Sequence, residues 1–214
     1  LRRQLVLELY ARMDASNFAE MVGAVARVSL ETGRENSDEW LVANTRAGQV
    51  GGAAAMEKWN KPGLRTTDQG RQTMWGWASV DPEAAMRWLD AATDISPGER
   101  AALLGCLTSG AVNCDVEQAK KMLADLPEQE RMSCVTPFIR HLVQNTGKEG
   151  AMDWLKSVVS SENGSAYARR VSEQVFDKLI WSGANQTNAA SMTADLERIS
   201  GVVPIDENWI VRSM

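Results

Sequence analysis

Three observations predict an all-α fold of stacked helical hairpins for this chain of 214 residues. A segment that is clearest from Trp77 to Leu89 (WASVDPEAAMRWL) recurs in degraded form along the sequence. Apolar residues in each copy follow the i, i+4, i+8 spacing of one helix face. The two-residue alternation of a β-strand is never sustained. The sequence therefore predicts an α-solenoid, a right-handed superhelix of about six hairpins of 30 to 38 residues.

The first helix of each predicted hairpin begins at a residue that suits a helix N-cap. The best example is Asp81, because Pro82 follows it at the first helical position. The six equivalent residues are Asp14, Gly51, Asp81, Asp115, Gly147 and Asn185. Four residues later the chain carries Ala in five of the six copies, and eight residues later mostly Leu, Val or Trp. We expect these two positions to face the core, with the small residue admitting a neighbouring helix.

The second helix of each hairpin has signals of its own. Ser96-Pro97-Gly98-Glu99 has the pattern of a capping box with Pro at the first helical position. Pro137 lies inside one of these helices and is expected to kink it. The predicted helices span 4–13, 14–30, 38–50, 52–60, 69–79, 82–92, 97–111, 116–125, 128–144, 148–160, 166–182, 187–199 and 206–212.

Scarce residue types exclude several chemistries. His141 is the only histidine, so zinc sites built from several histidines are excluded, and we expect no metal and no cofactor. The three cysteines, Cys106, Cys114 and Cys134, form no CxxC pair, and an odd number does not indicate a disulfide framework. We expect them to be buried free thiols. The sequence also lacks the phosphate-binding and nucleophile-elbow motifs.

Charge and hydropathy limit the partners and the compartment. With 23 Lys and Arg against 28 Asp and Glu, the net charge of −5 argues against nucleic acid as a partner. No apolar run approaches the roughly 18 residues of a membrane span, and no signal peptide is visible. We expect a soluble protein, in an unknown compartment, and a processed exported protein stays an open alternative. Residues 1–214 are interpreted as a single α-solenoid domain, compatible with a fragment of a longer array.

The pattern Trp77-Ala78-x-x-Asp81-Pro82-x-Ala84-Ala85-x-x-Trp88-Leu89 resembles that of uncharacterised bacterial α-helical repeat proteins. The frame of the repeat is also similar to that of HEAT and tetratricopeptide (TPR) arrays. This resemblance implies a helical-repeat fold and a binding role, and it brings no catalytic residues.

The favoured function is a non-catalytic protein–protein interaction scaffold or adaptor with a protein or peptide partner. The alternative is a carboxylate-based hydrolase or peptidoglycan-binding module that uses Glu35, Asp38 and Glu39, or Asp81 and Glu83. Asp81 is better explained as a helix cap, and the cluster near Glu35 as a solvated hairpin tip. A structural subunit of a homo-oligomer is a third reading, and the sequence does not indicate the oligomeric state.

Candidate partner-binding residues lie off the core stripe of the second helices. In helix 128–144 the apolar stripe leaves Arg140 on the opposite side and His141 at its edge, so both are candidate contacts. Trp75 is turned about 100° around its helix from Met74, whereas Trp77 shares the Met74 face. Trp75 is therefore predicted to be the most exposed tryptophan and a candidate anchor for a partner.

Overall fold

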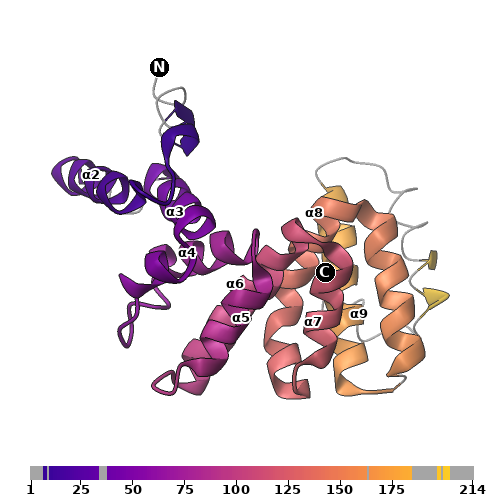
Figure 1. Ribbon diagram of the computed structural model, residues 1–214. Coiled ribbons are helices and arrows are strands. Elements are labelled where there is room, and N and C mark those ends of the chain that lie inside the picture. Colours follow the sequence, from indigo (N-terminus) through magenta and orange to yellow (C-terminus); the bar gives the residue numbers. More distant parts are fainter. Residues whose placement is uncertain are drawn as a thin grey trace. The chain divides into compact units, whose positions relative to one another are not determined.

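The computed structural model describes residues 7–8, 10–33, 38–162, 164–184, 197–198 and 200–202. This part of the chain is helical and contains no strand, which confirms the predicted all-α class (Figure 1). The helices are α2 (Phe18–Glu31), α3 (Asp38–Glu57), α4 (Asp68–Ala78), α5 (Pro82–Ala91), α6 (Pro97–Cys114), α7 (Val116–Asp125), α8 (Glu128–Ser161) and α9 (Ala166–Ala184). The predicted helix 206–212, and most of 187–199, lie outside the described residues.

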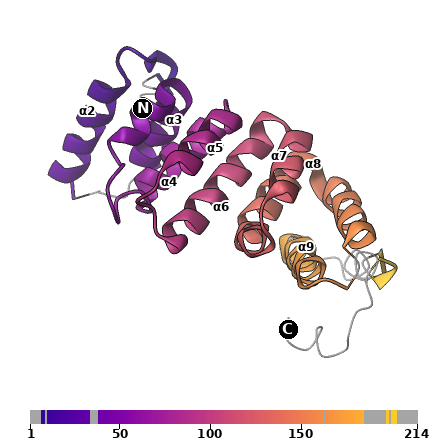
Figure 2. The ribbon, with the colours of Figure 1, turned by 60° about the horizontal axis from the view of Figure 1, so that its bottom comes forward.

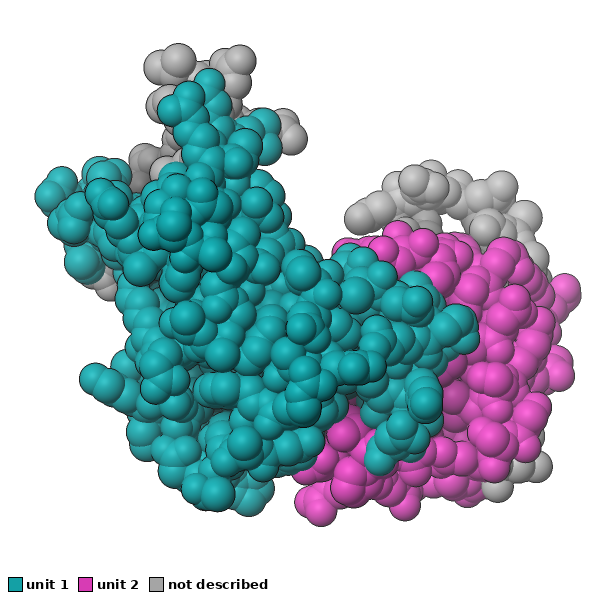
Figure 3. Space-filling view, viewed as in Figure 1, with its two compact units in different colours: residues 1–125 teal, residues 126–214 magenta. Residues whose placement is uncertain are grey.

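The chain divides into two compact units, residues 1–125 and residues 126–214 (Figure 3). The first unit contains α2 to α7, and the second contains α8 and α9. The interpretation of residues 1–214 as one domain stays a prediction.

Helix starts follow the capping residues named from the sequence. The Asp81 carboxylate accepts a hydrogen bond from the amide of Ala84 at 2.9 Å and opens α5. Ser96 and Glu99 form the predicted capping box at the start of α6. Asp115 accepts a hydrogen bond from the amide of Gln118 at 2.9 Å ahead of α7. Each side chain satisfies an amide that the first helical turn leaves without a partner.

Two predicted boundaries between helices coincide with breaks at glycine. Gly52 (φ 50°) breaks α3 at the boundary between the predicted helices 38–50 and 52–60, so α3 consists of two helical segments. Gly147 (φ 70°) breaks α8 in the same way. Both φ values lie in the left-handed region that favours glycine. Pro137 is not among the residues of α8 with non-helical φ/ψ, so the break in that helix lies at Gly147 instead.

Most of the predicted core positions in the described residues are buried, and the two exceptions, Phe18 and Trp59, are half-buried. Four residues after the helix start, Ala55, Ala85, Ala119 and Ala151 are at most 4% exposed. Eight residues after the start, the buried side chains are Val22, Leu89, Leu123 and Leu155, and the second helices bury Leu107, Phe138 and Phe176. The helical spacing therefore identified the faces that pack inward.

In the first unit, α4 packs against both α3 and α6, and the three helices form a layer (Figure 2). Their backbones meet at glycines. A Cβ atom at Gly48 of α3 would lie 2.1 Å from the carbonyl oxygen of Thr73, and one at Gly76 of α4 would lie 2.0 Å from that of Thr45. On the other side of α4, a Cβ atom at Gly110 would lie 2.5 Å from the carbonyl oxygen of Trp75. Larger residues at these positions would push the helices apart.

We expect Gly76→Ala to destabilise the protein by roughly 1–3 kcal/mol, because the added methyl group must displace helix backbone. Gly23→Ala is the control, since a Cβ atom at Gly23 in α2 would meet nothing within 4 Å. This control is expected to be neutral or to stabilise by up to about 1 kcal/mol. Urea unfolding of the two variants measures the difference. Equal effects at the two glycines would contradict the close packing of α3 on α4.

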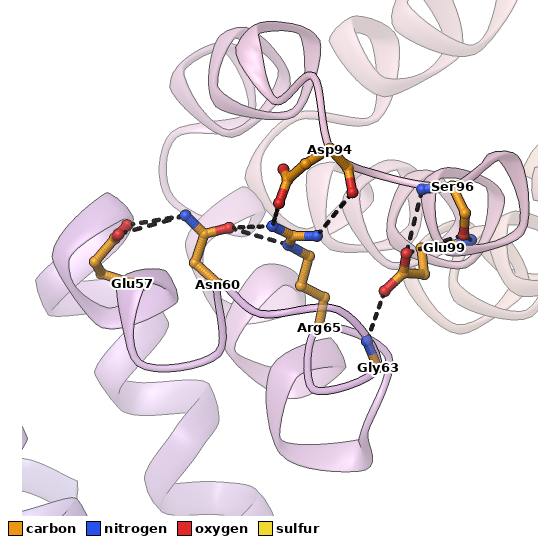
Figure 4. Close-up of polar contacts among 7 residues, drawn as sticks. All are labelled: Glu57, Asn60, Gly63, Arg65, Asp94, Ser96 and Glu99. Atoms are coloured by element: carbon orange, nitrogen blue, oxygen red, sulfur yellow. Dashed lines mark hydrogen bonds and ion pairs between the residues drawn. The ribbon is translucent and has the colours of Figure 1, made fainter.

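A buried arginine connects two loops of the first unit (Figure 4). Arg65, in the α3–α4 loop, is 1% exposed. Its Nη2 donates to Asp94 Oδ2 at 2.7 Å and to Asn60 Oδ1 at 2.8 Å, and its Nε donates to Asn60 Oδ1 at 3.0 Å. Glu99 adds a second connection by accepting from the amide of Gly63 at 2.9 Å. The loop before α4 is thereby held to the loop before α6.

Replacing Asp94 with Asn should lower the melting temperature, because Arg65 would stay buried without its carboxylate partner. The hydrogen bond from Arg65 holds the pKa of Asp94 below its usual range, and the Gly63 amide does the same for the pKa of Glu99. Their contribution to stability is therefore present above the usual carboxyl pKa and is lost as pH falls through the lowered value.

Glu117→Gln is the matched control, because it removes an exposed carboxylate that contacts only Lys120 at the surface of α7. Thermal unfolding at pH 7 checks the comparison. A melting temperature that falls no further for Asp94→Asn than for Glu117→Gln would show that the connection is dispensable.

Candidate functional site

The side of α3 and α4 opposite the core carries polar residues around a tryptophan. On α4, the core side is formed by Thr73, Met74 and Trp77, which are buried. Gln72, Trp75 and Ser79 lie on the other side at i, i+3, i+7 spacing and are half-buried. Thr45, Arg46 and Gln49 of α3 complete a surface that we call the α3–α4 polar face, defined as Thr45, Arg46, Gln49, Gln72, Trp75 and Ser79.

Hydrogen bonds across the two helices hold the side chains of this face. Thr45 Oγ1 donates towards Gln72 Oε1 at 3.0 Å. Gln49 Nε2 donates to Ser79 Oγ at 3.3 Å, and Gln49 Oε1 accepts from the hydroxyl of Tyr10 at 2.6 Å. Such bonds restrict the rotamers of long polar side chains before any partner arrives.

Arg46 is the only charged residue of the α3–α4 polar face. Its Nη1 donates to Gln49 Oε1 at 3.3 Å, and its Cζ lies 5.0 Å from the centroid of the Tyr10 ring. The ring face attracts the cation and orients the guanidinium group.

Trp75 is half-buried, and Trp40, Trp59 and Trp88 fall in the same intermediate range. The structure does not separate these four tryptophans, so the ranking of Trp75 as the most exposed stays a prediction. The close approach of α6 at Gly110 explains the shielding, because it brings a neighbouring helix to the backbone of Trp75. The helical phase correctly placed Trp75 on the side of α4 away from Met74 and Trp77. It contains no information on how close a neighbouring helix such as α6 lies.

The second unit contains the other two sequence candidates. Arg140 is exposed and His141 is half-buried on α8, as the phase of that helix predicted. Thr136, one turn before Arg140, donates to Gln174 Oε1 of α9 at 2.7 Å. This Thr–Gln pair between helices repeats the Thr45–Gln72 pair of the first unit. The sequence candidates thus divide between the units, with Trp75 in one and Arg140 and His141 in the other.

The pKa of His141 is lowered by burial and, to a smaller extent, by the neighbouring charge of Arg140. We expect the imidazole to titrate below about 6.5, its usual value. The native state then binds protons less readily than the unfolded chain, so stability should fall as pH drops below this value.

The proton NMR signal of the single imidazole measures the pKa of His141 directly. Arg140→Ala should raise it, whereas Lys148→Ala on the same helix serves as a comparison for the general loss of positive charge. An imidazole that titrates at or above its usual value would contradict the burial of this side chain.

Two of the carboxylates considered for hydrolytic chemistry, Asp81 and Glu83, have structural partners. Asp81 caps α5, and Glu83 accepts from Gln118 Nε2 at 2.9 Å. Asp38 is exposed at the start of α3, Glu39 is half-buried, and Glu35 lies outside the described residues. In the described part of the chain, no group of three His, Cys, Asp or Glu side chains is placed to hold a metal ion.

The three cysteines are free thiols in different surroundings. Cys134 is buried as expected, but Cys114 is exposed at the end of α6, so the expectation of burial is wrong there. Cys106 is half-buried, and desolvation raises the pKa of its thiol to about 11. A thiol with this pKa is protonated at neutral pH and is a weak nucleophile.

Comparison with protein-family models, curated proteins and solved structures finds no match to this chain. None of the described helices combines the length and the apolar character needed to cross a membrane. The residues that sequence reasoning missed at the candidate site are Arg46, Gln49 and Gln72. In the sequence these three residues are recognisable only as polar residues outside the apolar stripe of their helix. Many solvent-exposed residues share this property, so it does not identify a site.

Proposed function

We propose that the chain is a non-catalytic protein-binding scaffold, a superhelix of helical hairpins of the kind found in HEAT and TPR arrays. The observation that supports it is the α3–α4 polar face, where half-buried Trp75 lies between uncharged polar side chains that hydrogen bonds hold in place. Repeat proteins bind partners along such extended helix surfaces, and this role requires no reactive group.

Two properties of the face favour binding. A tryptophan supplies a large contact area with few rotatable bonds, and aromatic residues are enriched among those that dominate binding energy. The amides of Gln49 and Gln72 are oriented by Ser79 and Thr45, so less rotational entropy is lost when a partner arrives. In the second unit, exposed Arg140 beside the Thr136–Gln174 pair extends the proposal to α8 and α9.

The experiment begins with capture of partners by the immobilised full chain from cells of its source, followed by affinity measurements with the purified partner. Trp75→Ala is expected to weaken binding by about 2 kcal/mol or more. Arg140→Glu is expected to weaken binding while changing stability by no more than about 0.5 kcal/mol, because Arg140 is exposed.

Trp88→Ala is the matched control, because Trp88 is a half-buried tryptophan of α5 that packs edge-on against Trp77 at 6.2 Å and lies outside the face. It should lower stability without a comparable loss of affinity in the folded protein. Equal affinity losses for Trp75→Ala and Trp88→Ala would contradict the proposal. Enzymatic turnover of a peptide or glycan would also contradict the proposal, if the double substitution Asp38→Asn and Glu39→Gln abolished that turnover.

A further inference from the structure

Arg46 differs from every other arginine that is buried or half-buried in the described part of the chain. Arg65 is paired with Asp94, Arg100 with Asp90, Arg131 with Glu162 and Arg170 with Glu173. Arg46 is also half-buried, but none of its contacts is a carboxylate. A shielded cation without an anionic partner is costly, since neither water nor a counter-charge compensates it fully.

The guanidinium nitrogen of Arg46 that is left to meet a partner is Nη2. Nη1 donates to Gln49 Oε1, and the Tyr10 ring covers one face of the group. Nε has no hydrogen-bond partner within the described residues, but it is shielded from solvent, so an oxygen of a partner cannot reach it. Nη2 makes no hydrogen bond to the described residues and is not among their buried unpaired atoms, so it can donate to an anionic acceptor from outside.

We propose that the α3–α4 polar face recognises an acidic peptide segment, with an Asp or Glu side chain of the partner accepting a hydrogen bond from Nη2 of Arg46. This inference rests on the proposed function and specifies the class of partner. Gln49 and the Tyr10 ring position the guanidinium, Gln72 offers its amide to the peptide backbone, and Trp75 contacts an apolar neighbour of the acidic residue.

The charge of the face supports this occupant over a basic or neutral one. Arg46 is its single charged side chain, and the other five residues of the face carry no charge to compete for the carboxylate. A basic segment would place a second cation beside Arg46 and would leave Nη2 without an anionic acceptor.

The test uses an array of random ten-residue peptides that are acetylated at the N-terminus and amidated at the C-terminus, probed with the full chain. Each peptide that binds is remade with its acidic residues changed to Gln or Asn. We expect affinity to fall by about tenfold or more, as for loss of a charge-assisted hydrogen bond. Wild-type binding of the acidic peptides should also weaken at high salt.

Substitutions of arginine test whether Arg46 is responsible for the preference for acidic peptides. Arg46→Gln should remove the discrimination between acidic peptides and their amide versions. Arg46→Lys should keep only part of it, because Lys keeps the charge but lacks the planar guanidinium that Gln49 and the Tyr10 ring hold in place. Arg71→Gln is the matched control, since Arg71 is an exposed arginine of α4 outside the face. It should leave the discrimination intact. Melting temperatures identify any variant that fails to fold, and Arg46→Lys then takes the place of Arg46→Gln.

Several outcomes would overturn the inference. One is an equal affinity of wild type for acidic peptides and their amide versions, and another is undiminished discrimination in both Arg46 variants. Binding only of peptides with a free C-terminus would assign the carboxylate to a chain end and not to a side chain. If Trp75→Ala abolishes peptide binding while acidity has no influence, the scaffold function stands and the inference about Arg46 falls. If no peptide binds at all, both the proposed scaffold function and the inference about Arg46 are refuted.

Discussion

The contact of helix backbones at glycine is the constraint on which the first unit depends. Gly48 and Gly76 bring α3 and α4 so close that a side chain on either would meet a carbonyl oxygen. At this separation the short side chain of Thr45 reaches Gln72, and Gln49 reaches Ser79. Wider spacing would break both bonds. The polar face is therefore a consequence of where the glycines lie.

A second constraint on the first unit is the polar connection between its loops. Arg65 supplies this connection by bonding to Asn60 within its own loop and to Asp94 in the loop before α6. The buried guanidinium group is satisfied by both partners, which makes its burial tolerable.

Much of the fold could be predicted from the sequence because helix formation leaves local signals. Asp81 and Ser96 cap helices, and Leu89, Leu123 and Leu155 are buried, as their spacing indicated. The extent of exposure depends in addition on neighbouring elements. The exposure of Trp75 is set by α6 through Gly110.

The candidate site was accessible to sequence reasoning only in part. Trp75 and Arg140 could be assigned to the side of the helix away from the core, because that depends on phase alone. Arg46 was missed because its distinguishing property, the lack of a carboxylate among its contacts, depends on tertiary structure, including the packing of Tyr10 from a distant part of the sequence. Arg65 was missed for the same reason, since a loop arginine is ordinarily solvated.

Native-state hydrogen exchange resolved by residue is the measurement that tests the central claim, that the α3–α4–α6 layer is the rigid support of the polar face. If it is, the amides in the middle of α4 exchange only through global unfolding of the first unit, together with those of α3 and α6, while amides of α2 exchange through smaller openings. Exchange of the α4 amides through openings as small as those of α2 would contradict this account, because the face would then have no fixed geometry to present to a partner.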